Sequence, residues 1–316
     1  MEFKHIPVML EECLDGLSLK DDGIYVDATI GGAGHSSEIL KRTKNAYLIG
    51  IDQDEEAIEA SKNRLKEFSG RFTLVHDNFK NLPQILENLN IKEVDGILID
   101  LGVSSHQLDD KSRGFSFSAD ATLDMRMDKN NALTAKEVVN TYSEEKLKKI
   151  IYDYGEERFA GAIARHIVLA RNNKPIETTL ELKNLILSSV PRYKGNNGLD
   201  NVRRTFQAIR IEVNGELAIL ENALENAVKL LKKGGRLVVL SFHSLEDRIV
   251  KTVMKNASIN CTCPPEWPIC KCGGNNARLK IITKKPIEAS KEEREMNSRS
   301  TCAKLRIAEK IKQNEF

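Results

Sequence analysis

Three features are missing or scarce in this 316-residue sequence, and each excludes a class of protein. No uninterrupted apolar run approaches the ~20 residues that a membrane-spanning helix needs. The stretch from Met1 to Glu12 carries acids and a proline where a signal peptide would be apolar. Six cysteines in a chain of this length do not indicate a secreted disulfide scaffold. We therefore predict a soluble, cytoplasmic protein with no membrane partner, long enough for one large or two ordinary domains.

The formal net charge of +2 hides an uneven distribution of basic residues. From Lys232 to the C-terminus, 18 Lys and Arg stand against 9 Asp and Glu. A second basic cluster comprises Arg192, Lys194, Arg203, Arg204 and Arg210. Such clusters either neutralise the phosphates of a nucleic acid or form an ordinary solvated face, and composition alone leaves both interpretations open.

The segment from Ile24 to Asp54 predicts one βαβ unit around a glycine turn. We expect a strand at Ile24–Ala28, a helix at Ser36–Arg42 with Ser36 as its N-cap, and a second strand at Tyr47–Ile51. The turn between the first strand and the helix contains Gly31, Gly32 and Gly34. Glycines there let backbone amides approach a ligand above the helix N-terminus.

The acid after the second strand indicates that this ligand contains a nucleoside. Asp52 follows Gly34 by 18 positions, close to the roughly 20-residue offset at which an acid meets ribose hydroxyls. The dinucleotide pattern G-x-G-x-x-G fails because Ser37 replaces the third glycine. Asp27 on the first strand suits the ammonium of an amino acid better than a pyrophosphate. S-adenosylmethionine has that ammonium, a ribose and no phosphate.

The remaining chain predicts a sheet interrupted by a helical insertion. An apolar fourth strand begins at Val94 and ends in Asp100, as in a parallel sheet covered by helices on both faces. Amphipathic helices without a strand signal then follow, and the sheet pattern returns with a long helix at Thr205–Leu231 and a strand at Arg236–Ser241. We predict an α/β domain at 1–105 and 202–316, with an all-helical insertion at 106–201.

Six motifs in this order resemble one known family, the bacterial MraW-type 16S ribosomal RNA cytosine-N4 methyltransferases. The resemblance extends from His5 to Arg306. The motifs are Asp27-Ala-Thr-Ile-Gly-Gly-Ala-Gly-His-Ser36, Asp100-Leu-Gly-Val-Ser-Ser105, Arg113-Gly-Phe-Ser-Phe117, Leu123-Asp-Met-Arg-Met-Asp128, Arg204-Thr-Phe-Gln-Ala-Ile-Arg-Ile-Glu-Val-Asn214 and Ser241-Phe-His-Ser-Leu-Glu-Asp-Arg248.

The resemblance implies a class I methyltransferase (Rossmann-like) sheet, S-adenosylmethionine as methyl donor, and a cytidine in the decoding centre of 16S rRNA, within the 30S subunit, as acceptor. It also implies that an inserted helical domain recognises the substrate. By motif match, the cofactor contacts fall on Ala33, Gly34, His35, Asp52, Phe79, Asp100 and Gln107. The chain departs from the family pattern at His106, where proline is common, and at residues 297–302, where a proline and an arginine are missing.

The predicted catalytic candidates lie at two strand ends. The N4 lone pair of cytosine is delocalised into the ring, so an enzyme must hold N4 in line with the methyl group and accept a hydrogen bond from the amino group. Asp100 is the first candidate acceptor, and Ser241 and His243 are the second, although the histidine can equally be structural. Neither strand ends in a cysteine, which excludes the thiolate mechanism of ring-carbon methylation. We assign no metal to this chemistry.

For three further features, the sequence leaves two interpretations open. Cys261, Cys263, Cys270 and Cys272 form either a zinc site or a reduced thiol-rich loop beside Trp267. Phe115 and Phe117 in the loop Arg113–Phe117 either stack on a base or anchor the insertion to the sheet. His5 is either a substrate contact or structural.

Two other functions and the oligomeric state, monomer or dimer, also stay open. A non-catalytic RNA-binding assembly factor would retain the cofactor pocket. A nicotinamide oxidoreductase would need the missing third glycine.

Overall fold

The computed structural model describes residues 7–191, 197–264 and 266–313, so His5, Arg192 and Lys194 lie outside the described residues. The chain forms two compact units. The first, called the sheet unit, runs to Gly102 and resumes at Leu217; the second, the helical unit, is Val103–Glu216. Within the described ranges, no helix is long and apolar enough to cross a membrane.

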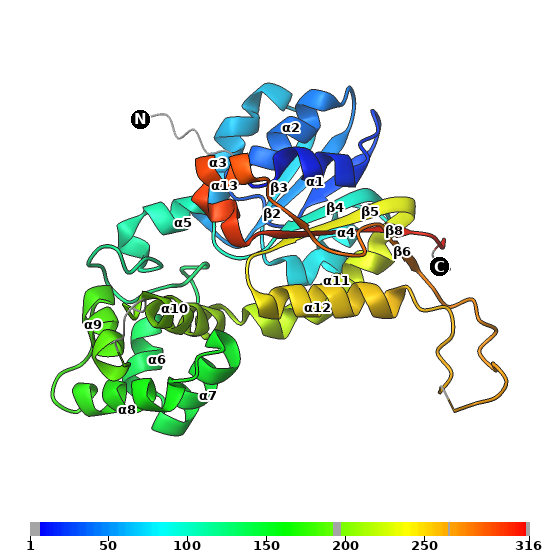
Figure 1. Cartoon of the computed structure of the whole chain (residues 1–316). Helices are drawn as coiled ribbons and strands as arrows, with labels where there is room; N and C mark the ends of the chain where they lie inside the picture. Colours follow the sequence, from blue (N-terminus) through cyan, green and yellow to red (C-terminus); the bar gives the residue numbers. More distant parts are fainter. Residues whose placement is uncertain (1–6, 192–196, 265, 314–316) are drawn as a thin grey trace. The chain divides into compact units, whose positions relative to one another are not determined.

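One mixed sheet forms the centre of the sheet unit, with the strand order β3-β2-β1-β4-β5-β8-β6 and β7 paired to β8 (Figure 1). β1 to β5 are parallel, whereas β8 is antiparallel to β5, β6 and β7. The strands are β1 (Ile24–Asp27), β2 (Tyr47–Asp52), β3 (Phe72–His76), β4 (Val94–Asp100), β5 (Leu231–Ser241), β6 (Leu279–Ile281), β7 (Ile287–Glu288) and β8 (Lys304–Lys310). The carboxyl ends of the parallel strands meet at one edge, where ligands bind in such sheets.

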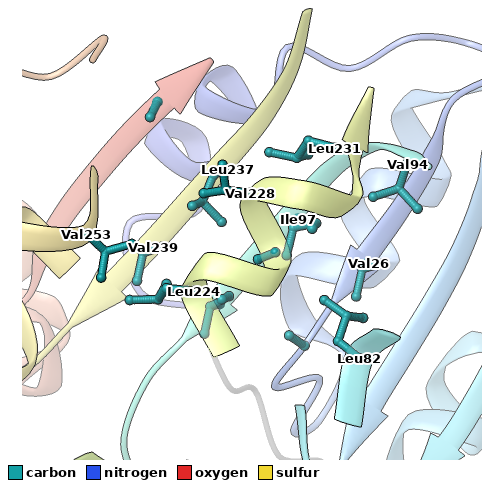
Figure 2. Close-up of a cluster of buried hydrophobic side chains, with 14 of the residues drawn as sticks. Val26, Leu82, Val94, Ile97, Leu224, Val228, Leu231, Leu237, Val239 and Val253 are labelled. Carbon is teal, nitrogen blue, oxygen red and sulfur yellow. The ribbon is translucent and has the colours of Figure 1, made fainter. Parts of the chain in front are cut away.

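Helices cover both faces of the sheet, which explains why β4 is apolar along its length. Ile97 and Ile99 point into a core that contains Leu224 and Val228 of α11, shown in Figure 2. Leu98, between them, points into the core on the opposite face, with α1 and α2. The helices of this unit are α1 (Leu10–Leu17), α2 (Gly34–Arg42), α3 (Glu55–Leu65), α4 (Leu82–Asn88), α11 (Glu216–Leu230), α12 (Ser244–Ala257) and α13 (Lys291–Met296), with short 3-10 turns η1 (Lys66–Phe68), η2 (Phe79–Asn81) and η4 (Ser298–Cys302).

Among its described residues, the helical unit has helices and a 3-10 turn as its regular elements. Its apolar core gathers buried side chains from all of its longer helices. The helices are α5 (Ser105–Asp109), η3 (Lys111–Arg113), α6 (Ala135–Thr141), α7 (Glu144–Gly155), α8 (Ala160–Arg171), α9 (Thr179–Ser189) and α10 (Leu199–Asn214). Capping boxes begin α5, α6 and α9, which fixes their start points locally.

The prediction of one long helix at Thr205–Leu231 is wrong. The chain instead forms α10 and α11, and Gly215 between them has φ 61°, in the left-handed region that ends a helix. The cause is that α10 buries Val202, Phe206 and Ile209 in the core of the helical unit, whereas α11 buries its apolar face against the sheet. The insertion therefore spans Val103–Glu216, and its predicted end at residue 201 cuts through α10.

Candidate cofactor and active site

The glycine turn after β1 brings a helix N-terminus to the carboxyl edge of the sheet. Gly31 has φ 51° and Ala33 has φ 56°, so the chain turns through two left-handed residues before α2 begins at Gly34. Ala33 is the N-cap of α2 and provides no side-chain hydrogen bond. No N-cap side chain therefore covers the N-terminus of α2, the kind of helix end at which anionic groups bind.

Gly34 is needed at this turn because the N-terminal segment passes close to it. A Cβ on Gly34 would lie 2.5 Å from Cγ of Pro7, whereas a Cβ on Gly32 would have no atom within 4 Å. His35 Nε2 lies 3.0 Å from the Val8 carbonyl oxygen, and its side chain is 6% exposed. What His35 can offer a ligand is therefore its backbone N–H, because its ring contacts the N-terminal segment.

Ser36 has a different role from the predicted N-cap. Its hydroxyl donates to Asp27 Oδ2 at 2.6 Å, and α2 begins two residues earlier. Asp27 is 2% exposed, and burial raises its pKa to about 6 although the Ser36 hydroxyl and the Thr29 N–H oppose that rise. Asp27 is thus a buried acid that accepts hydrogen bonds from Thr29 and Ser36.

Asp52 ends β2 and ties the second strand to the glycine turn. Its Oδ2 accepts from Gly31 N at 2.9 Å and its Oδ1 from Asp54 N at 3.0 Å. Burial raises the pKa of Asp52 to about 6, against these amide hydrogen bonds. Each carboxylate oxygen has a further lone pair, which suits the two hydroxyls of a ribose.

Asp100 ends β4 and is the least satisfied acid of this edge. Its N–H donates to Thr29 Oγ1 at 2.7 Å, but its Oδ1 is buried and has no hydrogen-bond partner among the described residues. Burial raises the pKa of Asp100 to about 8, and the charges of Asp27 and Glu246 add to the rise. A buried acceptor without a donor is costly and marks a place where a ligand group fits.

Ser241 and His243 follow β4's neighbour β5 and have structural partners. The Ser241 hydroxyl donates to the Lys304 carbonyl at 3.4 Å, and His243 is the N-cap of α12, where its Nδ1 accepts from Glu246 N. His243 Nε2 is buried and lies 3.1 Å from Glu246 Oε1, out of line for a hydrogen bond. These contacts favour the structural interpretation of His243 that the sequence had left open.

Glu246 is the residue that sequence reasoning missed. It is 2% exposed, accepts from Phe242 N at 2.9 Å, and contributes to the raised pKa of Asp100. The available signal was the capping-box spacing from His243 to Glu246, with a polar N-cap followed three residues later by a glutamate.

The loop after β3 is organised by its own polar groups. Asp77 Oδ1 accepts from Asn78 N and from Asn81 Nδ2, and the Asn78 amide donates to Gln53 Oε1 at 2.7 Å. Phe79 is half-buried and packs against the core shown in Figure 2. Asn78 therefore fixes this loop to the residue after Asp52, and the exposed part of the Phe79 ring is what remains for an adenine.

Two groups of candidates belong to the helical unit. Gln107 closes the capping box of α5, where its Oε1 accepts from Ser104 N at 3.0 Å. Phe115 is 8% exposed, and Phe117 packs edge-to-face on Phe206 with 5.3 Å between ring centroids. Both aromatic rings thus pack in the core of the helical unit.

The donor set at the edge of the sheet fits S-adenosylmethionine. Three acids lie at the ends of β1, β2 and β4, and in the described part of the chain none of the three forms an ion pair with a Lys or Arg. Their raised pKa values mean that a cationic ligand is favoured there, as sulfonium and ammonium groups are. Together the strand order and this acidic edge define a class I methyltransferase, as the sequence predicted.

The chain belongs to the MraW methylase family, whose sequence profile matches residues 2–311. It is 57% identical over 312 residues to the ribosomal RNA small subunit methyltransferase H of Clostridium botulinum (strain Kyoto / Type A2), covering 98% of this chain and 100% of that protein. The ribosomal RNA small subunit methyltransferase H of Finegoldia magna is 52% identical to this chain, over 98% of this chain and 100% of that protein. Family membership confirms S-adenosylmethionine as the cofactor that the sequence predicted.

A solved structure of a putative rRNA-methylase from Clostridium thermocellum also resembles this chain. The identity is 13% and the TM-score 0.45, over 97% of this chain and 100% of that one.

Proposed function

We propose that this protein transfers a methyl group from S-adenosylmethionine to the exocyclic N4 of a cytidine in the decoding centre, the P-site region, of small-subunit 16S rRNA. Its relatives at 51–57% identity are named ribosomal RNA small subunit methyltransferase H, which supports a small-subunit rRNA substrate. The observation that carries the choice of an amino nitrogen is the Oδ1 of Asp100 at the end of β4, which is buried and has no hydrogen-bond partner among the described residues. An amino group is a donor that such an oxygen lacks.

Asp100 acts on the acceptor through hydrogen bonding. When bound, the cofactor supplies an electrophilic methyl group on a sulfonium. A carboxylate of Asp100 that accepts a hydrogen bond from N4–H draws the amino group out of conjugation and orients its lone pair. In the free protein the pKa of about 8 keeps much of this acid protonated at neutral pH. A neighbouring sulfonium stabilises the charged form, so cofactor binding prepares the acceptor.

The other edge residues hold the cofactor. Asp52 accepts the ribose hydroxyls, and the backbone donors of Gly34 and His35 bind the amino-acid carboxylate at the start of α2. The ring of Phe79 covers the adenine. Asp27, through Ser36 and Thr29, contributes negative charge without direct contact. Gln107 belongs to the helical unit, and its assignment as a cofactor contact rests on the family motif alone.

RNA contacts belong to exposed basic side chains. Arg203 lies on α10 with 67% of its side chain exposed, and Arg204 with 46%. Arg210 instead binds Glu216 through two hydrogen bonds of 2.9 Å each, so it stabilises the helical unit. We expect the target base to leave its stack, because an embedded amino group cannot reach the methyl group.

The proposal is tested by tritiated methyl transfer to 30S particles from a strain that lacks the enzyme. Digestion to nucleosides and mass spectrometry should place the label on N4 of one cytidine. Label on a ring carbon or a ribose, or no transfer to particles and to naked 16S rRNA alike, would contradict it. Nicotinamide dinucleotides should leave the melting temperature unchanged, whereas S-adenosylhomocysteine should raise it.

A further inference from the structure

The segment between α12 and β6 has no apolar core to hold it. In Figure 1 this orange chain leaves the sheet unit as a long excursion, and its described residues from Ser258 to Arg278 form no helix or strand. None of the described residues 258–276 joins an apolar core of either unit. Trp267 is 48% exposed and Ile269 is 73% exposed. A loop of this length inside an ordered domain needs another source of order.

Four cysteine sulfurs meet in this segment. The Sγ atoms of Cys261, Cys263, Cys270 and Cys272 all lie within 4.8 Å of one another, and all four thiols are free. The Sγ distances are 3.5 Å from Cys261 to Cys270, 3.5 Å from Cys270 to Cys272, and 3.7 Å from Cys272 to Cys261. A disulfide bond would require about 2.05 Å.

These separations are those of a tetrahedral metal site. With zinc–sulfur bonds of about 2.3 Å, the edges of an ideal tetrahedron of sulfurs are about 3.8 Å long. The measured spacings are within 0.3 Å of that value for three edges. The cysteines form two pairs, Cys261 with Cys263 and Cys270 with Cys272, and one residue separates the two members of each pair. The fold brings the two pairs together across the loop.

The backbone around the sulfurs is arranged for thiolates. Thr262 N donates to Cys272 Sγ at 3.4 Å, and Lys271 N donates to Cys263 Sγ at 3.3 Å. Such N–H to sulfur bonds stabilise the negative charge that four thiolates place around a divalent ion. Each of these hydrogen bonds joins one cysteine pair to the other. The cluster is therefore formed by the residues of both pairs.

The chain reverses and closes directly after the last cysteine. Gly273 has φ 77° and Gly274 φ 64°, a turn that favours glycine. Asn276 then pairs with Asn260 through its backbone N–H and its side chain, each at 3.0 Å from the Asn260 carbonyl oxygen. The loop is thus closed at its base by hydrogen bonds and at its centre by the sulfur cluster.

We propose that Cys261, Cys263, Cys270 and Cys272 bind one Zn²⁺ with all four thiolates and that this ion orders the loop. The four sulfurs fill the tetrahedron and leave no position for water, so the site is structural and takes no part in methyl transfer. Zinc matches the soft, all-sulfur donor set and needs no redox partner. The site is independent of the proposed substrate.

The loop contains an intrinsic fluorescent probe. Trp267 is the single tryptophan of the chain and lies between the two cysteine pairs, with Lys271 Nζ 5.0 Å from the centre of its ring. Its fluorescence therefore reports the order of the loop, while far-ultraviolet circular dichroism reports the helices and the sheet.

Protein purified under reducing conditions from zinc-containing medium should hold one zinc ion per chain by elemental mass spectrometry. Replacement by Co²⁺ should give the intense visible bands and the thiolate charge-transfer band of tetrahedral sulfur coordination. In the double variant Cys261→Ser with Cys270→Ser, the bound zinc should fall to a small fraction of one. Cys302→Ser, an exposed cysteine outside the loop, is the matched control and should keep full occupancy.

Chelation of the wild-type protein provides a measurement that does not depend on folding of a variant. Zinc removal should shift the Trp267 emission and expose the loop to protease, with little change in circular dichroism, and added Zn²⁺ should reverse both effects. Chains purified from zinc-containing medium with no bound zinc or with iron in its place, or a chelated protein whose Trp267 emission and protease sensitivity do not change, would overturn the proposal. A protein mass lower by two hydrogen atoms for each cysteine pair would also overturn the proposal, because the pairs would then be disulfides.

Discussion

β4 carries an aspartate near each end, and the two carboxyls have opposite environments. Asp95, near the start, accepts from Lys20 Nζ at 2.9 Å, from Lys232 Nζ at 2.6 Å and from Ile24 N at 3.0 Å. Although burial alone would raise it, these partners hold the pKa of Asp95 below its usual value. Asp100, at the other end, has a buried oxygen without a partner and a pKa raised to about 8.

The difference shows that one strand carries a satisfied acid at one end and an unsatisfied acid at the other, as far as the described residues go. Two lysines satisfy Asp95, so its charge joins the strand to its neighbours. Asp100 is buried, and the acids Asp27 and Glu246 add negative charge near it. Its own charge is therefore compensated only when a ligand brings a cation or a hydrogen-bond donor. The proposed role of Asp100 would explain why the fold keeps a destabilising group at its carboxyl edge.

The largest expected effect is on catalysis at the carboxyl end. Asp100→Asn keeps the shape of the side chain but removes the acceptor charge, and we expect methyl transfer to fall by about 10²–10⁴-fold. Single-turnover assays with saturating cofactor measure this loss. Asp21→Asn, an exposed acid before β1, is the matched control and should retain full activity. Equal rates for the two variants would remove Asp100 from the reaction.

The same variant should gain stability in the absence of ligand. The raised pKa means that ionised Asp100 costs folding free energy, a cost that begins above the ordinary value of 3.8 and is complete near 8. The melting temperature of Asp100→Asn relative to wild type should therefore increase between those two pH values. A constant difference across that range would show that Asp100 does not titrate as the structure indicates.

Cofactor binding should depend to a smaller degree on Asp52, at the end of β2. Asp52→Asn retains the size of the side chain but weakens its acceptance of ribose hydroxyls and amides, and should reduce S-adenosylhomocysteine affinity by about 10–100-fold, as for loss of a charged hydrogen bond. Isothermal titration calorimetry measures it, with Asp21→Asn as control. Unchanged affinity would place the pocket elsewhere on the protein.

Loss of the Asp95 charge, at the amino end of β4, should lower the stability of the protein and leave its activity unchanged. Asp95→Asn removes the charge between Lys20 and Lys232, whose side chains are 54% and 38% exposed, and should cost about 1–2 kcal/mol of unfolding free energy at neutral pH. Because the folded pKa of Asp95 is lowered, this contribution is lost in wild type as pH falls below 3.8, and the two proteins should then converge. Denaturant titrations at neutral and acidic pH test both parts.

The smallest effect separates two glycines of the turn. Gly34→Ala places a Cβ 2.5 Å from Pro7 and should destabilise the protein without ligand by about 1 kcal/mol, whereas Gly32→Ala meets no atom within 4 Å and should not. Thermal melts of the two variants give the comparison. Equal melting temperatures would mean that the N-terminal segment moves aside at no cost.

Local patterns were sufficient for most of the secondary structure. The β-branched runs around the glycine turn, and the apolar length of β4, predicted strands that the structure contains. Ser36 shows the limit of such reasoning. A serine after glycines is a good N-cap by local chemistry, but the buried carboxyl of Asp27 competes for its hydroxyl. The boundary at residue 201 failed for a similar reason, because the residues that α10 packs against are distant in sequence.

The sequence by itself determined the family, the parallel sheet and the acids at its strand ends, since these depend on residue type and spacing along the chain. Only the tertiary structure decided which acids are neutralised and which are left without partners. Lys232 is 137 positions from Asp95, and Glu246 is far along the chain from Asp100, so no local pattern encodes either environment. The pKa of a carboxyl depends on burial and on charges close in space, and folding creates both.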